Sequence, residues 1–183
     1  MRIIAGAKGG LLLKFPKSAL VRPATEKVRG AIFNILGDIE NHILLDLFAG
    51  SGSLGFEGLS RGAGQCVFVD TLDQSIKILK TNAQKLDFLP QCLIIKGLIP
   101  SVLRQIKKQI NQFDEVFIDP PYDRNLINVS LAGLASNNLV DAGSTIIIEH
   151  SPREVPSYQG FKTVDQRKYG QTLVSFLKKI ERV

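Results

Sequence analysis

A chain of 183 residues, 44% of them hydrophobic, can bury one core of ordinary size but not two, so we expect a single domain with at most a small appendage. No apolar run approaches the roughly 20 residues that span a bilayer, and the N-terminus lacks the long apolar stretch of a signal peptide, so we predict a soluble, cytoplasmic protein without membrane association. The formal net charge of +6 resides in residues 1–30, where seven basic side chains accompany one acid, because the rest of the chain balances to zero.

The N-terminal segment carries this charge and precedes the regular part of the pattern. "RIIAG" and "GLLLKFP" are expected to form a small hairpin, and "TEKVRGAIFNIL" predicts a helix with Thr25 or a neighbour near its N-cap. We assign residues 1–36 to this basic extension and residues 37–183 to the main part of the same domain. Lys and Arg in such a segment suit contacts with a nucleic-acid backbone, although a solvated surface explains the charge equally well.

From residue 43 onward, short apolar runs alternate with helix-period segments, as in "ILLDLF", "SLGFEGLSRG", "QCVFVD", "DQSIKILKTNAQKLD", "QCLIIK", "IPSVLRQIKKQI" and "FDEVFID". This alternation predicts an α/β domain with a mostly parallel sheet and helices on both faces. Apolar residues recur at helical spacing at Ile76, Leu79, Ala83 and Leu86.

The C-terminal third first continues this alternation of strands and helices and then departs from it. A helix is predicted near Leu126 to Ala135, and "GSTIIIEH" predicts the fifth parallel strand. The tail contains two alternating stretches joined around Tyr169 and Gly170, which indicates an antiparallel hairpin at the edge of the sheet.

The cysteines and histidines do not indicate a disulfide or a metal site. Cys66 and Cys92 lie at or inside apolar strands, where buried thiols are more common than a disulfide or metal ligands. His42 and His150 are the only histidines, which is too few for a multi-histidine metal centre, so we treat both as structural and expect no metal.

The stretch "LLDLFAGSGSLG" follows the first parallel strand and opens a helix. Gly50, Gly52 and Gly55 satisfy G-x-G-x-x-G, and Asp70 ends the next strand, where an acid can bind ribose hydroxyls, so an adenosine-containing ligand is predicted. Asp46 stands just before the loop, where a carboxylate would repel a pyrophosphate but suits the cationic side of S-adenosylmethionine. This charge favours the methyl donor over a nicotinamide dinucleotide.

The stretch "FDEVFIDPPYDR" places Asp119 at the carboxyl end of the fourth parallel strand, where ligands bind in such sheets. Pro120 and Pro121 lack N–H groups, so the carbonyls around them remain available as acceptors that can orient an amino group toward an electrophilic methyl. Tyr122 offers a flat face on which a base can stack. The alternative is a Pro-Pro turn that only caps the strand.

These segments, together with "RIIAGAKGGLLLKFP", "VRPATEKVRGAIFNIL" and "RKYGQTLVSFL", resemble the RsmD family of bacterial methyltransferases almost from end to end. Members of that family methylate a guanine N2 amino group in small-subunit ribosomal RNA. The resemblance implies a Rossmann-like methyltransferase fold with a seven-stranded sheet and an antiparallel C-terminal hairpin. It also implies S-adenosylmethionine as the donor, and ribosomal RNA or a small-subunit particle as the partner of a monomeric enzyme.

Carried over by position, the resemblance implies three groups of site residues. The amino-group site comprises Asp119, Pro120, Pro121 and Tyr122. The donor site comprises Asp46, Phe48, Ala49, Gly50, Ser51, Gly52, Asp70, Thr71, Gly97 and Leu98. The RNA-binding residues comprise Arg2, Lys8, Lys14, Arg22, Pro23, Lys27, Arg29, Lys168 and Tyr169, of which the last two are expected first in a hairpin turn and only second as an RNA contact.

The sequence departs from the family pattern at two places. "KGLIP", at the end of the third strand, lacks the acid that often contacts the donor adenine, and Ala24 separates Pro23 from Thr25 where a threonine more usually follows the proline directly. Three other functions remain open at this point: adenine-N6 methylation of DNA, a non-catalytic nucleotide-binding factor in RNA assembly, and, last, a dinucleotide oxidoreductase.

Overall fold

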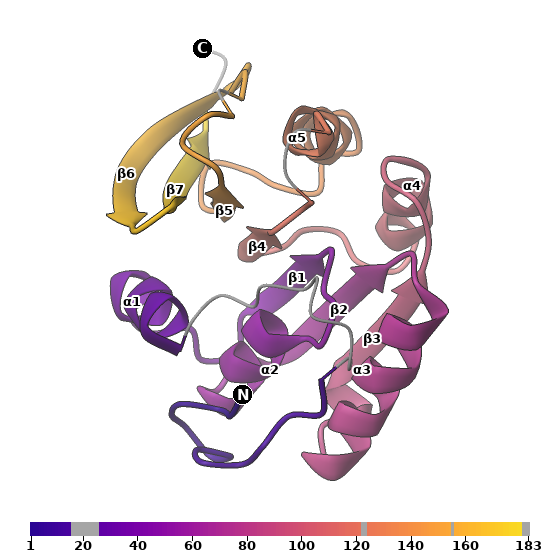
Figure 1. Ribbon diagram of the computed structural model, residues 1–183. Coiled ribbons are helices and arrows are strands. Elements are labelled where there is room, and N and C mark those ends of the chain that lie inside the picture. Colours follow the sequence, from indigo (N-terminus) through magenta and orange to yellow (C-terminus); the bar gives the residue numbers. More distant parts are fainter. Residues whose placement is uncertain (16–25, 122–123, 155, 181–183) are drawn as a thin grey trace. The chain divides into compact units, whose positions relative to one another are not determined.

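The computed structural model describes residues 1–15, 26–121, 124–154 and 156–180 (Figure 1). Arg22, Pro23, Thr25 and Tyr122 lie outside these ranges, so what the sequence predicts for them stays a prediction. The chain forms two compact units, residues 1–96 and 97–183. Within the described ranges, no helix is both long and apolar enough to cross a membrane.

The first unit is built on three parallel strands. Its elements in chain order are α1 (Glu26–Leu36), β1 (Ile43–Leu47), α2 (Ser53–Ser60), β2 (Gln65–Asp70), α3 (Asp73–Lys85), the 3₁₀ turn η1 (Leu89–Gln91) and β3 (Cys92–Lys96). Leu45 pairs with Val67, and Val67 pairs with Leu93. The interior residues of β1 and β2 are buried, which accounts for their continuous apolar sequence in a sheet covered by helices.

Helices α2 and α3 pack directly on these strands, α2 on β1 and β2 and α3 on β2 and β3 (Figure 1). The close approach of α2 depends on Gly55, because a Cβ there would lie 2.3 Å from the Phe68 ring and 2.6 Å from the Cys66 sulfur. On α3, the predicted apolar positions Leu79 and Ala83 are buried. Ile76 is only half-buried, since Ile78 occupies the core in its place.

The N-terminal segment forms the predicted hairpin. Arg2 and Leu12 make an antiparallel bridge, the Ile3 N–H donates to the Leu11 carbonyl over 2.9 Å, and the Leu13 N–H donates to the Met1 carbonyl over 3.0 Å. The hairpin is tied to α2, where the Ala7 N–H donates to the Ser60 carbonyl over 2.7 Å.

The second unit contains α4 (Ser101–Lys107), β4 (Glu115–Ile118), α5 (Leu126–Ser136), β5 (Thr145–His150), β6 (Phe161–Tyr169) and β7 (Thr172–Lys179). Strands β4 and β5 are parallel, whereas β7 runs antiparallel to both β5 and β6. The tail hairpin turns at Gly170, whose φ is 62°, as predicted. Helix α4 is shorter than the segment predicted to be helical, residues 99–110. Beyond Lys107 the chain continues in a tighter turn, in which the Gln109 N–H donates to the Ile106 carbonyl.

The strands follow the order β3-β2-β1-β4-β5-β7-β6 in one seven-stranded sheet, which confirms the Rossmann-like fold with an antiparallel C-terminal hairpin. Both cysteines are free, with Cys66 buried and Cys92 half-buried. His150 is buried and bonded through Nε2 to the Ser175 hydroxyl (2.9 Å), which agrees with the structural role predicted for it.

Candidate functional site

The glycine loop between β1 and α2 has an unusual backbone. Phe48, Gly50 and Gly52 all have positive φ, at 63°, 57° and 78°. A positive φ is costly for a bulky side chain such as that of Phe48 and is retained mainly where the backbone shape serves a site. The Ala49 N–H donates to the Val69 carbonyl over 2.9 Å and thereby fixes the loop to the end of β2.

The glycines of this loop serve different purposes. A Cβ on Gly52 would lie 2.5 Å from the Phe56 ring and 2.7 Å from Leu79, and its N–H donates to the Ala49 carbonyl over 2.7 Å. The described contacts of Gly52 are therefore structural. A Cβ on Gly50 would meet only the Phe48 carbonyl oxygen, at 4.0 Å, so Gly50 is the glycine that leaves room for a ligand.

Asp70, at the end of β2, fastens the loop. Its Oδ2 accepts the Gly50 N–H over 2.8 Å, and its Oδ1 accepts the Leu72 N–H over 2.9 Å. The carboxylate is half-buried, and each oxygen retains a second lone pair that a ribose hydroxyl could approach. The same side chain can thus shape the loop and bind a ligand.

Asp46, near the end of β1, is buried under the start of α2. Its Oδ2 accepts the Gly55 N–H over 3.0 Å and satisfies one of the free amides of that helix terminus. Burial raises the pKa of Asp46 to about 7, and the charge of Asp70 adds to the rise, whereas the Gly55 bond opposes it. A cationic ligand beside this carboxyl group would favour its ionised form.

Asn82 of α3 is a residue that the sequence analysis missed. Its fully buried Nδ2 donates to the Ser51 carbonyl over 2.9 Å and to the Lys14 carbonyl over 3.1 Å, and its Oδ1 accepts the Lys14 N–H over 2.7 Å. One amide therefore holds both the glycine loop and the N-terminal segment. The signal in the sequence is a polar residue on an otherwise apolar helix face.

Two further predicted donor positions differ in exposure. Ser51 is buried within the glycine loop, and Thr71 is exposed directly after Asp70, at the end of β2. Leu72, which was not predicted, keeps 61% of its surface exposed, as an apolar group against which a flat ring could pack.

The second unit contains Asp119, Pro120 and Pro121, the corner that is predicted to bind the amino group. Strand β4 ends at Ile118, and Asp119 follows it half-buried, with Pro120 buried and Pro121 exposed. Gly97 packs against Val102, which a Cβ would meet at 2.8 Å, whereas Leu98 has 71% of its surface exposed. Leu98 is thus the accessible member of this predicted pair.

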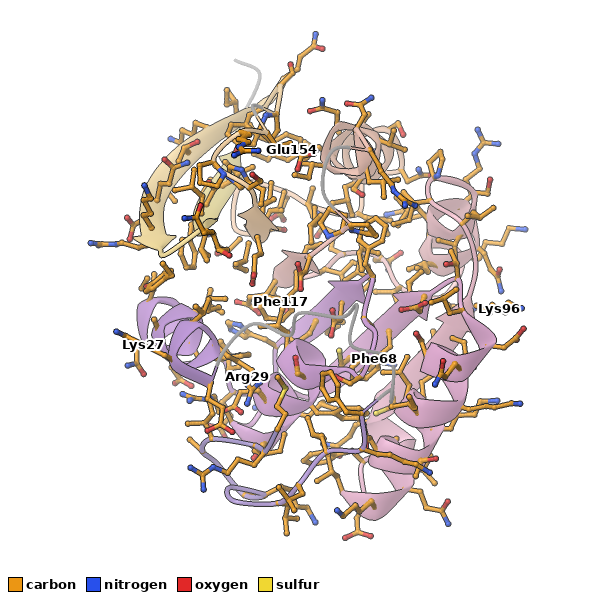
Figure 2. All side chains as sticks on the ribbon, in the orientation of Figure 1. Lys27, Arg29, Phe68, Lys96, Phe117 and Glu154 are labelled. Atoms are coloured by element: carbon orange, nitrogen blue, oxygen red, sulfur yellow. The ribbon has the colours of Figure 1, made fainter. Side chains whose placement is uncertain are left out.

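The prediction that Arg29 contacts RNA is wrong. Arg29 is completely buried on α1, where its Nε approaches Glu57 Oε2 at 3.4 Å and its Nη2 donates to the Arg2 carbonyl. Figure 2 shows Arg29 on the inner side of α1 and Lys27 on its outer side. Burial lowers the pKa of Arg29, which the charge of Glu57 partly restores. This guanidinium anchors the N-terminal hairpin and cannot reach a phosphate.

Glu57 holds both Arg29 and the N-terminal hairpin, and this role was not predicted from the sequence. Its Oε2 accepts the Ile4 N–H over 2.8 Å, and its Oε1 accepts the Ala5 N–H over 3.1 Å and Arg61 Nε over 2.8 Å. The side chain is fully buried. An acid inside the apolar pattern of α2 is its only signal in the sequence.

The remaining predicted RNA contacts differ in their surroundings. Arg2 pairs with Glu26 at 3.3 Å, and the half-buried Lys8 pairs with Asp87 at 3.0 Å. Lys14 and Lys27 are exposed. In the second unit Lys168 is exposed and Tyr169 half-buried at the β6–β7 turn.

A groove of about 290 Å³ adjoins Lys14 in the first unit. It is lined by Lys14, Phe15, Gln74, Lys77, Ile78 and Thr81. Two ammonium groups beside an aromatic ring suit a nucleic-acid segment, because the cations attract phosphate and the ring can stack on a base.

Comparison with known proteins gives a consistent result. Residues 1–178 match the family described as "Conserved hypothetical protein 95". The chain is 34% identical over 182 residues to the "Putative rRNA methyltransferase YlbH" of Bacillus subtilis, covering 98% of this chain and 99% of that one. It is 38% identical over 152 residues to the "Ribosomal RNA small subunit methyltransferase D" of Haemophilus influenzae, covering 81% and 78%.

A solved structure described as "Putative methyltransferase yhhF from Escherichia coli" superposes with a TM-score of 0.85 at 27% identity, covering 98% of this chain and 97% of that one. Sequence and structure therefore agree along nearly the whole chain. The chain belongs to the "Conserved hypothetical protein 95" family, the RsmD/YlbH family of methyltransferases.

Proposed function

We propose that this protein is an S-adenosylmethionine-dependent methyltransferase that methylates the N2 amino group of a guanine in small-subunit ribosomal RNA. The observation that carries the proposal is the glycine loop, fixed by Asp46 and Asp70 in a shape that leaves space at Gly50. The Asp-Pro-Pro corner after β4 supports it, as do relatives named as ribosomal RNA methyltransferases.

In the donor site, each acid has a distinct task. Asp70 holds the Gly50 amide in place and binds the ribose hydroxyls through its remaining lone pairs. Asp46 supplies negative charge near the cationic part of the donor, whose sulfonium carries the electrophilic methyl group. The exposed Leu72 packs against the adenine, which compensates for the missing acid at the end of β3.

In the amino-group site, catalysis is mostly positioning. Asp119 and the carbonyl of Pro120 accept the two N2 hydrogens, which turns the nitrogen lone pair toward the methyl group. The new bond forms between N2 and the methyl carbon while the carbon–sulfur bond breaks and its electron pair stays on sulfur. The extra proton then leaves N2 for solvent, so no buried general base is required.

The activity is tested by mass spectrometry of ribosomal RNA nucleosides from cells with and without the gene, and by methyl transfer in vitro. We expect Asp119→Ala to lower transfer by about 10²- to 10³-fold while donor affinity stays near that of the wild type. Asp70→Ala should show the opposite pattern and weaken donor binding about 10-fold or more. N2-methylguanine at wild-type levels in cells that lack the gene would refute the proposal.

RNA binding is assigned to the exposed lysines of the first unit. Lys14 and Lys27 are exposed, and Lys14 lines the groove that contains Phe15. Replacing both by glutamate should weaken RNA binding and lower the slope of log affinity against log salt by about 1 for each lost phosphate contact. Lys108→Glu, at an exposed position on the second unit, is the matched control. Equal slopes for the wild type and the double variant would remove these lysines from the interface.

A further inference from the structure

The end of β5 holds an acid next to the amino-group corner. Strands β4 and β5 are parallel, and the last residues that pair between them are Ile118 and Ile148. Continuing this register by one residue places Asp119 beside Glu149, at the usual spacing of about 4.8 Å between strands. Because side chains alternate between the faces of a sheet, Asp119 and Glu149 project from the same face.

Neither Val174 nor His150, its neighbours across the sheet and along the strand, donates a hydrogen bond to Oε2 of Glu149. Across from it on β7 lies Val174, which is apolar and buried. His150 is the next residue and projects from the opposite face, where it bonds to Ser175. Glu149 is only 8% exposed, and its Oε2 has no hydrogen-bond partner among the residues that the structure describes.

A buried carboxylate oxygen without a donor is rare in folded proteins and is costly, so it calls for an explanation. Burial raises the pKa of Glu149 to about 7, because a buried carboxylate loses its hydration. A ligand that brings an N–H to this oxygen would provide the missing partner. The acid therefore has the surroundings of a binding residue rather than of a structural anchor such as Glu57.

Guanine supplies two neighbouring donors of this kind. Its N1–H lies next to the N2 amino group on the same edge of the base, whereas adenine presents an acceptor at N1. We propose that Glu149 is a specificity-determining residue that accepts the N1–H of the target guanine while Asp119 accepts the amino group. This inference rests on the proposed function, and it explains how a corner that suits any exocyclic amine can select guanine.

The test compares two bases at the target position of an RNA fragment of the small subunit, once nucleoside mapping has located it. One substrate carries guanine there, and the other carries 2-aminopurine, which keeps the amino group but lacks the N1–H. The wild type should methylate guanine about 10- to 100-fold faster, as expected for a hydrogen bond to a charged group. Glu149→Leu should lose most of this preference by slowing the guanine reaction alone.

Two variants serve as controls. Glu149→Gln keeps an acceptor oxygen and should retain an intermediate preference for guanine. Glu154 also has a buried Oε2 that no described residue bonds to, but it lies on the β5–β6 connection and not at the end of a strand (Figure 2). Glu154→Gln should therefore discriminate between the two bases as the wild type does. Unchanged donor binding, measured by calorimetry, shows that each variant is folded.

The results separate the two proposals. If the wild type forms no N2-methylguanine, the proposed function fails. If it methylates guanine but treats 2-aminopurine equally well, or if Glu149→Leu keeps the full preference for guanine, the role of Glu149 fails and the proposed function stands.

Discussion

Two sets of carboxylates, one in each unit, differ in how their oxygens are satisfied. In the first unit, Asp46, Asp70 and Glu57 all accept backbone N–H groups, and Glu57 also accepts two arginine side chains. In the second unit Asp141 also accepts backbone N–H groups, but Glu149 and Glu154 each keep a buried oxygen without a partner in the described part of the chain. Asp46, Asp70 and Glu57 thus hold the backbone in place before a ligand binds, whereas Glu149 has an oxygen that a ligand can bind.

This difference matters for function because the two reactants differ in kind. The donor is the same in every turnover, so a loop fixed by internal hydrogen bonds loses little entropy when it binds. The base is delivered as part of a large RNA, and selecting it requires groups that are satisfied only by the right edge. The acids that hold the glycine loop and the acid at the end of β5 therefore have opposite roles.

The largest effect is expected when the anchor in the first unit is removed. Glu57→Ala leaves Arg29 buried without its carboxylate and frees the amides of Ile4 and Ala5. Breaking a buried ion pair from one side typically costs about 3 to 5 kcal/mol, so the free energy of unfolding in urea should fall by that order.

Glu26→Ala is the matched control, because Glu26 pairs with Arg2 on the surface, where its side chain is 43% exposed. Its loss should cost less than about 1 kcal/mol. If the two variants lose the same stability, Glu57 is not an anchor, and the contrast between the two units no longer holds.

Much of the fold could be predicted from the sequence, and the reasons are local. Apolar runs such as "QCVFVD" are strands because both faces of a parallel sheet are covered, and the turn at Gly170 follows from alternation on either side of a glycine. The spacing of the glycines locates their loop, but that spacing cannot show that Gly52 and Gly55 serve packing whereas Gly50 faces open space.

The errors arise where a charged residue points inward. Arg29 stands in a basic segment whose pattern predicts a surface position, yet the helix turns it toward Glu57, some 28 positions along the chain. Asn82 escapes prediction for a related reason, since its role depends on Ser51 and Lys14, which are distant in sequence. Charge patterns predict which segment is basic, but only the packing decides which of its side chains meet solvent.

A smaller effect, and one of opposite sign, is expected at Asp46. Its pKa is about 7 in the folded protein and near 3.8 when unfolded, so between these values the folded state holds more protons and stability falls as the pH rises. Asp46→Asn keeps an acceptor for the Gly55 N–H without the charge. It should therefore be more stable than the wild type at pH 8, by about 1 to 4 kcal/mol in urea unfolding, and the gain should vanish near pH 4.

Donor binding should show the reverse pattern. Wild-type affinity for S-adenosylmethionine, measured by calorimetry, is expected to rise from pH 6 to pH 8 as Asp46 ionises beside the cationic donor, whereas the Asp46→Asn variant should bind about 10-fold more weakly at pH 8 with little dependence on pH. A carboxyl group that lowers the stability of the folded protein but raises its affinity for the donor serves ligand binding rather than folding. If the variant gains no stability at pH 8 and binds the donor as tightly as the wild type, Asp46 is only a helix cap, and the acids of the first unit serve the backbone alone.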